Sequence, residues 1–401
     1  MKLYKKHISD LGKVITGKTP RTSILENYGG KIPFLTPSDN LSEKFSPTTS
    51  KTLTKIGLNE VKNCLLPSKS ICVSCIGSDL GKVVLTKKPT VTNQQFNSIV
   101  PNEENDADFI YYLMTVVGKH LNYLSKTSTA VPIINKSTFA NYEIEIPNIK
   151  EQKRIGEILS SLDDKIELNR RINDNLGQQA QALFKSWFVD FEPFKKGKFI
   201  DSELGMIPEG WQVEELGNIT NSITEKVGKR TDVKVLSPVN TGELLLSEEY
   251  FTKQVYSKTL AKYIMVAPND FAYNPARINI GSIGMNTFDF SGCVSPVYVV
   301  FRCEKEYHHF FNIFKATKNF KEEVNTRAIG GVRQTLSYKD FSLIKIVYPP
   351  KEAVEQFNKI YSHIMTLIKK NVLENKRLHQ TRDTLLPKLM SGELKINDIN
   401  N

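Results

Sequence analysis

This chain contains the segment Ser137-Thr-Phe-Ala-Asn-Tyr-Glu-Ile-Glu-Ile-Pro147 and, farther along, a second copy written Lys339-Asp-Phe-Ser-Leu-Ile-Lys-Ile-Val-Tyr-Pro349. In both copies a phenylalanine comes third, and a β-prone run leads to a closing proline. Shorter matches before and after them keep the same order, for example Asn169-Arg170-Arg171-Ile172 with Asn375-Lys376-Arg377-Leu378. A period of about two hundred residues is far longer than that of solenoid repeats, so the sequence predicts duplicated domains rather than a repeat array.

A long amphipathic pattern follows each copy, within residues 148–193 and 351–401. Each pattern runs for about forty residues, or about 60 Å of helix, and carries one apolar stripe. Because a narrow stripe is not stable alone, we expect the two helices to bury their stripes against each other as a coiled coil. The alternative is that each helix packs separately on its own strand-rich domain. The predicted stripe residues are Ile155, Leu159, Leu162, Ile166, Ile172, Leu176, Ala180, Leu183 and Trp187, followed by Phe357, Ile360, Ile364, Leu367, Val372, Leu378, Leu385 and Leu389.

Two asparagines interrupt the stripes at matching points. Asn169 and Asn375 fall at or beside the predicted seam. An asparagine buried in such a seam fixes register and orientation at some cost in stability. On the flank of the helix, each would be only a solvated residue.

The segments before the helices, residues 1–147 and 194–350, predict mixed α/β domains that are rich in strands. Short β-branched and aromatic runs such as Val83–Thr86 and Val297–Phe301 are separated by Gly, Pro, Asn and Ser, which is typical of strands and turns. Helical patches at Phe109–Met114 and His309–Phe314 occupy similar places in the two halves. The predicted fold class is therefore α+β, with two strand-rich domains and two long helices in an internal repeat.

The charge of the chain is concentrated in the two strand-rich segments. Of the net charge of +11 over 401 residues, residues 1–147 carry +6 and residues 194–350 carry +3. Such a distribution suits binding to a polyanion such as DNA, and the alternative is a merely lysine-rich surface. No apolar run approaches a membrane span, the N-terminus lacks a signal-peptide core, and five scattered cysteines suit a reducing compartment. We therefore expect a cytoplasmic protein without a membrane partner.

Several motifs together resemble one family. Glu151-Gln152-Lys-Arg-Ile155 opens the first helix, Leu183-Phe-Lys-Ser-Trp-Phe-Val-Asp-Phe191 closes it, and Ile207-Pro-Glu-Gly-Trp211 opens the second domain. The ending Thr381-Arg382-Asp383-Thr-Leu385-Leu-Pro-Lys-Leu-Met-Ser-Gly-Glu-Leu394 is the most specific of these motifs. Together they resemble the specificity subunit of Type I restriction-modification systems over essentially the whole chain. One departure is that His7-Ile-Ser-Asp-Leu-Gly12 lacks the tryptophan that Trp211 supplies in the second repeat.

The resemblance implies a non-catalytic subunit with two target recognition domains, each reading one half of a split sequence in double-stranded DNA. It implies that an antiparallel, pseudo-twofold pair of helices sets the spacer between the half-sites. Modification subunits that methylate adenine with S-adenosylmethionine would dock along those helices, and restriction subunits would add ATP- and Mg-dependent translocation and cleavage. This chain would itself bind none of these cofactors.

Candidate DNA contacts are polar or basic side chains in glycine-rich loops between predicted strands. Arginine bonds guanine edges, asparagine and glutamine bond adenine, and lysine and serine serve phosphates. The loop from Arg327 to Gln334 is the strongest, because two glycines allow close backbone approach between arginines. The alternative for each residue is an ordinary turn. The candidates are Ser74, Gly77, Ser78, Lys82, Asn93, Gln94, Gln95, Lys126, Ser128 and Thr129 in the first domain, and Asn274, Arg277, Asn279, Ser282, Ser295, Arg327, Arg333 and Gln334 in the second.

Signatures of catalysis are weak in this sequence. The acidic-x-lysine pattern of metal-dependent nucleases occurs at Glu60-Val61-Lys62 but also at many other places, and no glycine-rich cofactor fingerprint follows a strand. Cys72-x-x-Cys75 lacks a second close pair, which favours buried strand cysteines over a zinc site. His308-His309 lies in an aromatic patch and favours packing over metal binding. We therefore predict a DNA-recognition subunit; the alternative is a self-contained DNA methyltransferase or nuclease with paired recognition domains.

Overall fold

The computed structural model describes residues 1–45, 48–125, 133–251, 253–328 and 335–394. The chain divides into two compact units. Unit 1 comprises Met1–Arg171 and Asn371–Asn401, and unit 2 comprises Ile172–Lys370. Each unit therefore contains one strand-rich part and a portion of each long helix.

The main sheet of unit 1 has four antiparallel strands in the order β2-β9-β6-β7. Alternate residues of β6 point to opposite faces, as strand geometry requires: Ile71 and Val73 join one apolar cluster and Cys72 joins another. Both faces are thus covered, which explains why every residue of β6 is buried. The strands are β2 (Gly12–Thr16), β9 (Phe96–Pro101), β6 (Ile71–Ser74) and β7 (Val83–Leu85).

Smaller elements complete the strand-rich part of unit 1. Helix α2 packs on one face of the main sheet, with Phe109, Ile110 and Met114 in the same apolar cluster as Ile71. A second sheet has the order β4-β3-β8-β5, and β1 pairs with β10 just before the first long helix. These elements are α2 (Ala107–Ser125), α1 (Lys55–Glu60), α3 (Lys136–Ala140), β1 (Tyr4–His7), β3 (Tyr28–Leu35), β4 (Lys51–Leu53), β5 (Leu65–Leu66), β8 (Thr90–Thr92) and β10 (Glu143–Ile146).

Unit 2 repeats this plan. Its main sheet has the order β14-β21-β18-β19, and β13 pairs with β22 as β1 pairs with β10. Two helices, α7 and α8, follow β21 where the single helix α2 follows β9. The same order of equivalent strands confirms the internal repeat. The strands are β11 (Phe199–Ile200), β12 (Ile207–Pro208), β13 (Gln212–Glu215), β14 (Thr220–Ile223), β15 (Leu236–Pro238), β16 (Leu244–Leu246), β17 (Ile264–Val266), β18 (Phe271–Tyr273), β19 (Ile283–Met285), β20 (Gly292–Val294), β21 (Val299–Cys303) and β22 (Lys345–Tyr348), and the helices are α5 (Leu216–Ile219), α6 (Ser247–Tyr250), α7 (His308–Phe314), α8 (Lys318–Arg327) and α9 (Tyr338–Ser342).

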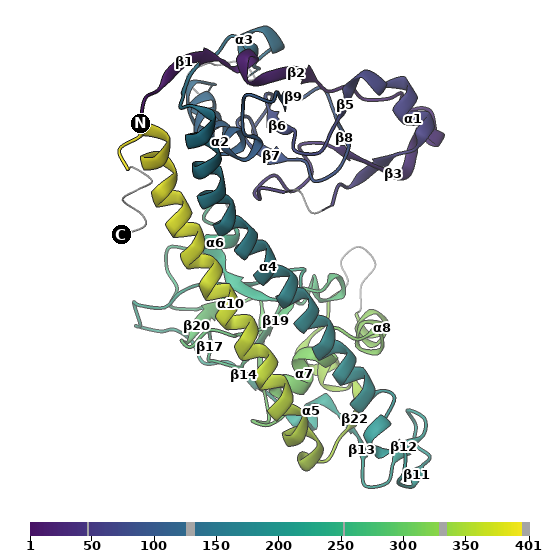
Figure 1. Ribbon diagram of the computed structural model, residues 1–401. Helices are drawn as coiled ribbons and strands as arrows, with labels where there is room; N and C mark the ends of the chain where they lie inside the picture. The colour runs from purple at the N-terminus through teal and green to yellow at the C-terminus, as the bar shows by residue number, and fades with distance from the viewer. Residues whose placement is uncertain (46–47, 126–132, 252, 329–334, 395–401) are drawn as a thin grey trace. The chain divides into compact units, whose positions relative to one another are not determined.

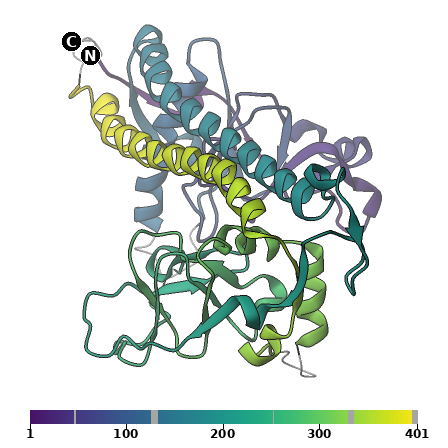
Figure 2. The same ribbon diagram turned by 90° about the horizontal axis from the view of Figure 1, so that it is seen from below.

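Two long helices, α4 (Ile149–Phe188) and α10 (Lys351–Ser391), lie side by side and run in opposite directions (Figures 1 and 2). In unit 1, Asn169 Nδ2 donates to Asn375 Oδ1 at 2.9 Å. In unit 2, the rings of Phe184 and Phe357 lie 6.1 Å apart. Within unit 1 alone, Arg382 Nη1 also donates to Asp163 Oδ1, so contacts move down α10 as they move up α4. This confirms an antiparallel pair and places the two matched asparagines at its seam.

The predicted stripe is only partly correct. Ile360 and Val372 are 46% and 56% exposed, and Ile172 and Leu367 are also exposed. The physical reason is that each helix buries residues against its partner helix and against a strand-rich part, so its apolar surface is not one narrow stripe. Phe184 and Tyr361, which the stripe did not include, are buried in the unit 2 core. The helices therefore pack against each other, as predicted, and also against the strand-rich parts.

Candidate nucleic-acid interface

Loops of unit 1 converge at one edge of the main sheet. Because β2, β9, β6 and β7 alternate in direction, the ends of β2 and β6 lie beside the beginnings of β7 and β9. The segment after the undescribed residues 126–132 is tied to the same edge, since Ile134 N–H donates to Cys75 O at 2.9 Å and Asn97 Nδ2 donates to Ile134 O at 3.1 Å. We call residues 17–19, 75–82, 93–95 and 133–135 the first loop edge.

The first-domain candidates differ in accessibility at this edge. Ser78, Lys82 and Gln94 are exposed, and Gln94 Oε1 accepts from Thr19 Oγ1 at 2.6 Å. Lys82 forms an ion pair with Asp79 at 2.8 Å. The other described candidates are part of the internal structure of the loops. Ser74 is buried, Gly77 has φ of +86° in a tight turn, and Asn93 bonds Gln95 through its side chain. Lys126, Ser128 and Thr129 lie outside the described residues.

Two exposed lysines were missed by the sequence analysis. Lys18 follows β2, and Lys136 opens α3. Burial raises the pKa of the Cys64 thiol, and the positive charges of Lys18 and Lys136 oppose this rise, so both ammonium groups lie near the same thiol. The polar stretch Thr16-Gly-Lys-Thr-Pro20 was the available signal for Lys18. The sequence gives no sign that Lys136 lies on the same side as Lys18, because this follows from the order of the strands in the sheet.

Unit 2 forms an equivalent edge. The loop between β18 and β19, residues 274–282, lies beside residues 295–298 before β21. Leu336 N–H donates to Pro275 O at 3.1 Å, which repeats the bond from Ile134 to Cys75 in unit 1. We call residues 274–282, 295–298 and 335–336 the second loop edge.

Arg277 is the exposed basic candidate at the second loop edge. Burial raises the pKa of the Tyr298 phenol, and the charge of Arg277 opposes that rise. Ser282 is buried and donates to Pro238 O at 2.8 Å, while Arg327 pairs with Glu323 at 3.0 Å on α8. The remaining candidates are Asn274, which accepts from Ala276 N–H within its own turn, half-buried Asn279 and Ser295, and Arg333 and Gln334, which lie outside the described residues.

The cysteine and histidine motifs take packing positions. Cys72 and Cys75 are 0% and 2% exposed, as predicted for buried strand cysteines. His309 packs its ring 5.0 Å from the ring of Tyr361. Within the described ranges, no group of His, Cys, Asp and Glu side chains is arranged to hold a metal, and none of the helices is long and apolar enough to cross a membrane.

Known proteins share this architecture and sequence. The S subunit of a Type I restriction-modification system from M. genitalium superposes with a TM-score of 0.59, covering 97% of this chain and 96% of that one at 16% identity, which supports the fold. A family model described as the Type I restriction modification DNA specificity domain matches residues 2–178. The Type I restriction enzyme MjaIX specificity subunit of Methanocaldococcus jannaschii is 30% identical over 98% of this chain and 94% of its own length. The HindI specificity subunit of Haemophilus influenzae is 38% identical over 42% of this chain and 38% of its own.

The chain belongs to the family of Type I restriction-enzyme specificity subunits. Its role is therefore DNA recognition within a restriction-modification system, and the subunit is not itself an enzyme. The self-contained methyltransferase or nuclease is not favoured, because the match to a specificity subunit spans nearly the entire chain.

The motifs that carried the resemblance pack the ends of the long helices into strand-rich cores. Leu386 and Leu389 of the C-terminal motif join the core of unit 1 beside Ile155 and Leu159. Phe184 of the motif that ends α4 joins the core of unit 2. These motifs therefore build the scaffold and do not form the loop edges.

Proposed function

We propose that the two loop edges read the two halves of a split DNA sequence. The repeated connection from Ile134 to Cys75 and from Leu336 to Pro275 carries this proposal, because in each half it ties the segment before a short helix to the same edge as loops of the main sheet. Such loops present variable side chains on a rigid sheet, as sequence-specific readers require. The recognition domains would comprise residues 1–147 and 194–350, and the helices would lie in residues 148–193 and 351–401.

Within the loop edges, exposed side chains are the best candidates for DNA contact. Ser78, Lys82 and Gln94 in the first edge and Arg277 in the second are accessible without rearrangement. We add Lys18 and Lys136 as phosphate contacts, since phosphate neutralisation supplies sequence-independent affinity. The buried candidates would serve by shaping the loops.

Partner subunits would supply the chemistry. We propose that modification subunits, with S-adenosylmethionine, dock along α4 and α10, and that restriction subunits bring ATP and Mg²⁺ in the cytoplasm. Exposed apolar side chains support a docking surface on the helices of unit 1: Leu168, Val372 and Leu373 are 48%, 56% and 59% exposed. The paired helices would set the spacer between half-sites, because half-site spacing follows from protein geometry.

A domain exchange tests the two-reader assignment. Residues 1–147 are replaced by the equivalent domain of another specificity subunit, and adenine methylation is mapped genome-wide in a host that carries the modification subunit. One half of the methylated motif should change and the other should persist. Exchange of residues 194–350 is the reciprocal control, and changes in both halves from either exchange would contradict the proposal.

A point substitution tests the second loop edge. Arg277→Ala should weaken binding to DNA that carries both half-sites by about 1–3 kcal/mol and relax sequence preference at one position. The comparison is Arg230→Ala, which removes another exposed arginine of unit 2 that pairs with Glu225. Equal losses for cognate and unrelated DNA would show that Arg277 contacts only the backbone.

A further inference from the structure

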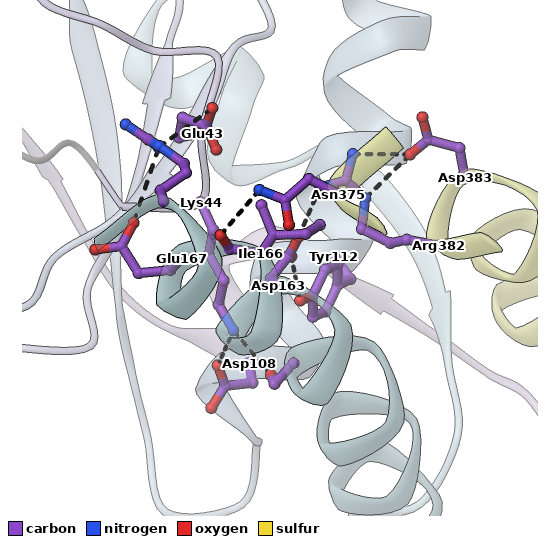
Figure 3. Close-up of polar contacts among 12 residues, drawn as sticks. Glu43, Lys44, Asp108, Tyr112, Asp163, Ile166, Glu167, Asn375, Arg382 and Asp383 are labelled. Carbon is purple, nitrogen blue, oxygen red and sulfur yellow. Dashed lines mark hydrogen bonds and ion pairs between the residues drawn. The ribbon is translucent and has the colours of Figure 1, made fainter. Parts of the chain in front are cut away.

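A buried carboxylate joins three helices of unit 1 (Figure 3). Asp163 on α4 is 7% exposed, and its Oδ1 accepts from Arg382 Nη1 on α10 at 2.6 Å. Its Oδ2 accepts from Tyr112 Oη on α2 at 2.5 Å. Since α2 belongs to the strand-rich part, one side chain connects that part to both long helices.

The charges of this cluster are held in place by their surroundings. Burial lowers the pKa of Arg382, but the carboxylates of Asp163 and Asp383 together outweigh it and keep the guanidinium pKa above its usual value. Burial and the Asp163 carboxylate raise the pKa of the Tyr112 phenol, so its hydroxyl stays protonated and donates. The guanidinium and the phenol thus keep the protonated forms that their bonds require.

A second ion pair stabilises the contact of α2 with the long helices, which we call the polar joint. Lys44, whose side chain is 3% exposed, donates to Asp108 Oδ1 on α2 at 2.6 Å and to Ser160 Oγ on α4 at 2.8 Å. Its Nζ also lies 5.0 Å from the centre of the Tyr112 ring. Figure 3 shows the Lys44 side chain pointing toward Asp108, and its bond to Ser160 meets α4 three residues before Asp163. The joint therefore consists of directional bonds made away from solvent, where they are strong and intolerant of misalignment.

The equivalent positions of unit 2 have different chemistry. Asn169 and Asn375 are 206 residues apart, and at this offset Lys369 stands in place of Asp163 and Leu176 in place of Arg382. The buried polar cluster is thus particular to the first half of the repeat. Scaffold stability alone does not demand it, because a buried ion pair contributes little net stability relative to apolar packing and is retained where orientation matters.

We propose that Asp163, Arg382 and Tyr112 form an orientation lock that fixes the angle of the first recognition domain on the helix pair and so narrows the range of DNA spacer lengths that the subunit accepts. The inference rests on the proposed function. Changing the spacer by one base pair turns one half-site by about 35°, because B-DNA repeats every 10 to 10.5 base pairs. A domain held by directional bonds cannot follow that rotation, whereas a domain held by apolar contacts can turn part of the way.

The test compares spacer lengths in the complete methyltransferase. The Asp163→Leu/Arg382→Leu double variant removes both charges together, so no unpaired charge is left buried. It is assembled with the modification subunit, and initial methylation rates are measured on duplexes with the native half-sites at the native spacer and at spacers one base pair shorter and longer. Discrimination between native and altered spacers should fall about tenfold relative to the unsubstituted complex, with unchanged dependence on each half-site sequence.

Two further variants keep the result interpretable. Tyr112→Phe removes one bond of the lock, and its discrimination should fall about threefold. Lys165→Gln removes a half-exposed ion pair with Glu374 between the same helices, and should leave discrimination unchanged. A merely structural role would slow methylation at all spacers alike and leave the ratio of rates unchanged.

The outcomes separate the lock from the proposed function. If the unsubstituted complex ignores the half-site sequences, the proposed function fails. If it reads both half-sites but the folded double variant discriminates between spacers as well as the unsubstituted complex does, the lock is overturned. Should the double variant not fold, unchanged discrimination by Tyr112→Phe overturns it.

Discussion

Unit 1 adds buried charges to the apolar contacts between its strand-rich part and the long helices, whereas unit 2 joins the two through aromatic rings. Around Asp163 the bonds are short and directional. Around Phe188 of α4 in unit 2, rings pack at centroid distances of 5.0 Å to Phe310 of α7 and 6.0 Å to Trp211. The two halves of the repeat therefore use different side chains to connect the strand-rich part to the long helices. Aromatic packing stabilises mainly through the large apolar area that it buries, while the hydrogen-bonded ion pair adds contacts that depend on direction.

The aromatic joint should show the largest stability loss. Phe357 is 0% exposed, and its ring lies within 6.3 Å of the rings of Phe184, Trp187 and Phe188 on α4. Phe357→Ala should lower the free energy of unfolding by about 4 kcal/mol, because it deletes a large buried side chain. Urea unfolding monitored by far-ultraviolet circular dichroism, which reports on both units, measures the loss. Leu373→Ala on the same helix, at 59% exposed, is the control, and similar losses for both would remove the contrast between joints.

The polar joint should respond differently to single and double substitution. Asp163→Ala leaves the Arg382 guanidinium with only the exposed Asp383 carboxylate as a partner, at 2.9 Å, and should cost about 3 kcal/mol. Combining it with Arg382→Leu should restore part of that loss, since the buried guanidinium that lost its Asp163 partner is gone. The same urea experiment on single and double variants gives the coupling. Strictly additive losses would mean that the ion pair does not define this joint.

Acid should destabilise unit 2 through the protonation of His309. Burial, with the positive charges of His308 and Lys369, lowers the pKa of His309 to about 4 from 6.5. The unfolded chain binds a proton as the pH falls through 6.5, while the folded chain does so only near 4. Stability is therefore complete above pH 6.5 and declines as the pH falls toward 4, by about 2 kcal/mol at pH 5.

This acid effect can be assigned with one variant. His309→Phe keeps an aromatic ring against Tyr361 and removes the titrating group. The difference in unfolding free energy between pH 7.5 and pH 5 should shrink by about 2 kcal/mol in the variant. An unchanged difference would show that other groups cause the acid sensitivity.

An exposed ion pair in unit 1 should have the smallest effect. Lys165 and Glu374 lie 3.5 Å apart across the two helices, with side chains 44% and 42% exposed. Because solvent screens such a pair, Lys165→Gln should change the unfolding free energy by less than about 0.5 kcal/mol. A loss as large as that of Asp163→Ala would mean that burial is not what distinguishes the lock.

The repeat, the two helices and the fold class were predictable. The apolar spacing of the helices and the matched segments of the two halves can both be seen in the sequence itself. The outward position of Val372 was not, since spacings of three and four do not reveal which apolar residues face the partner helix. The lock was also beyond the sequence. Asp163 and Arg382 are 219 residues apart, and each alone resembles an ordinary solvated charge on a helix.

The candidate loops were predicted from glycine and polar residues between strands, and the structure brings the described ones to two sheet edges. Which members are accessible could not be predicted, because Ser74 and Ser78 differ only by their place in one turn. The neighbouring charges of Lys18 and Lys136 come from segments far apart in the chain, so they required the sheet order.

The five cysteines offer a means of following DNA binding by fluorescence. Burial raises the pKa of Cys72 to about 12 and of Cys75 and Cys293 to about 11, and it raises that of Cys303 as well. These four thiols are buried and poorly ionised, whereas Cys64 is only half-buried. Because the thiolate is the reactive form, a maleimide dye should attach first to Cys64. The dye would then lie near Lys18 and Lys136, where an arriving DNA backbone would change its emission without any engineered label site.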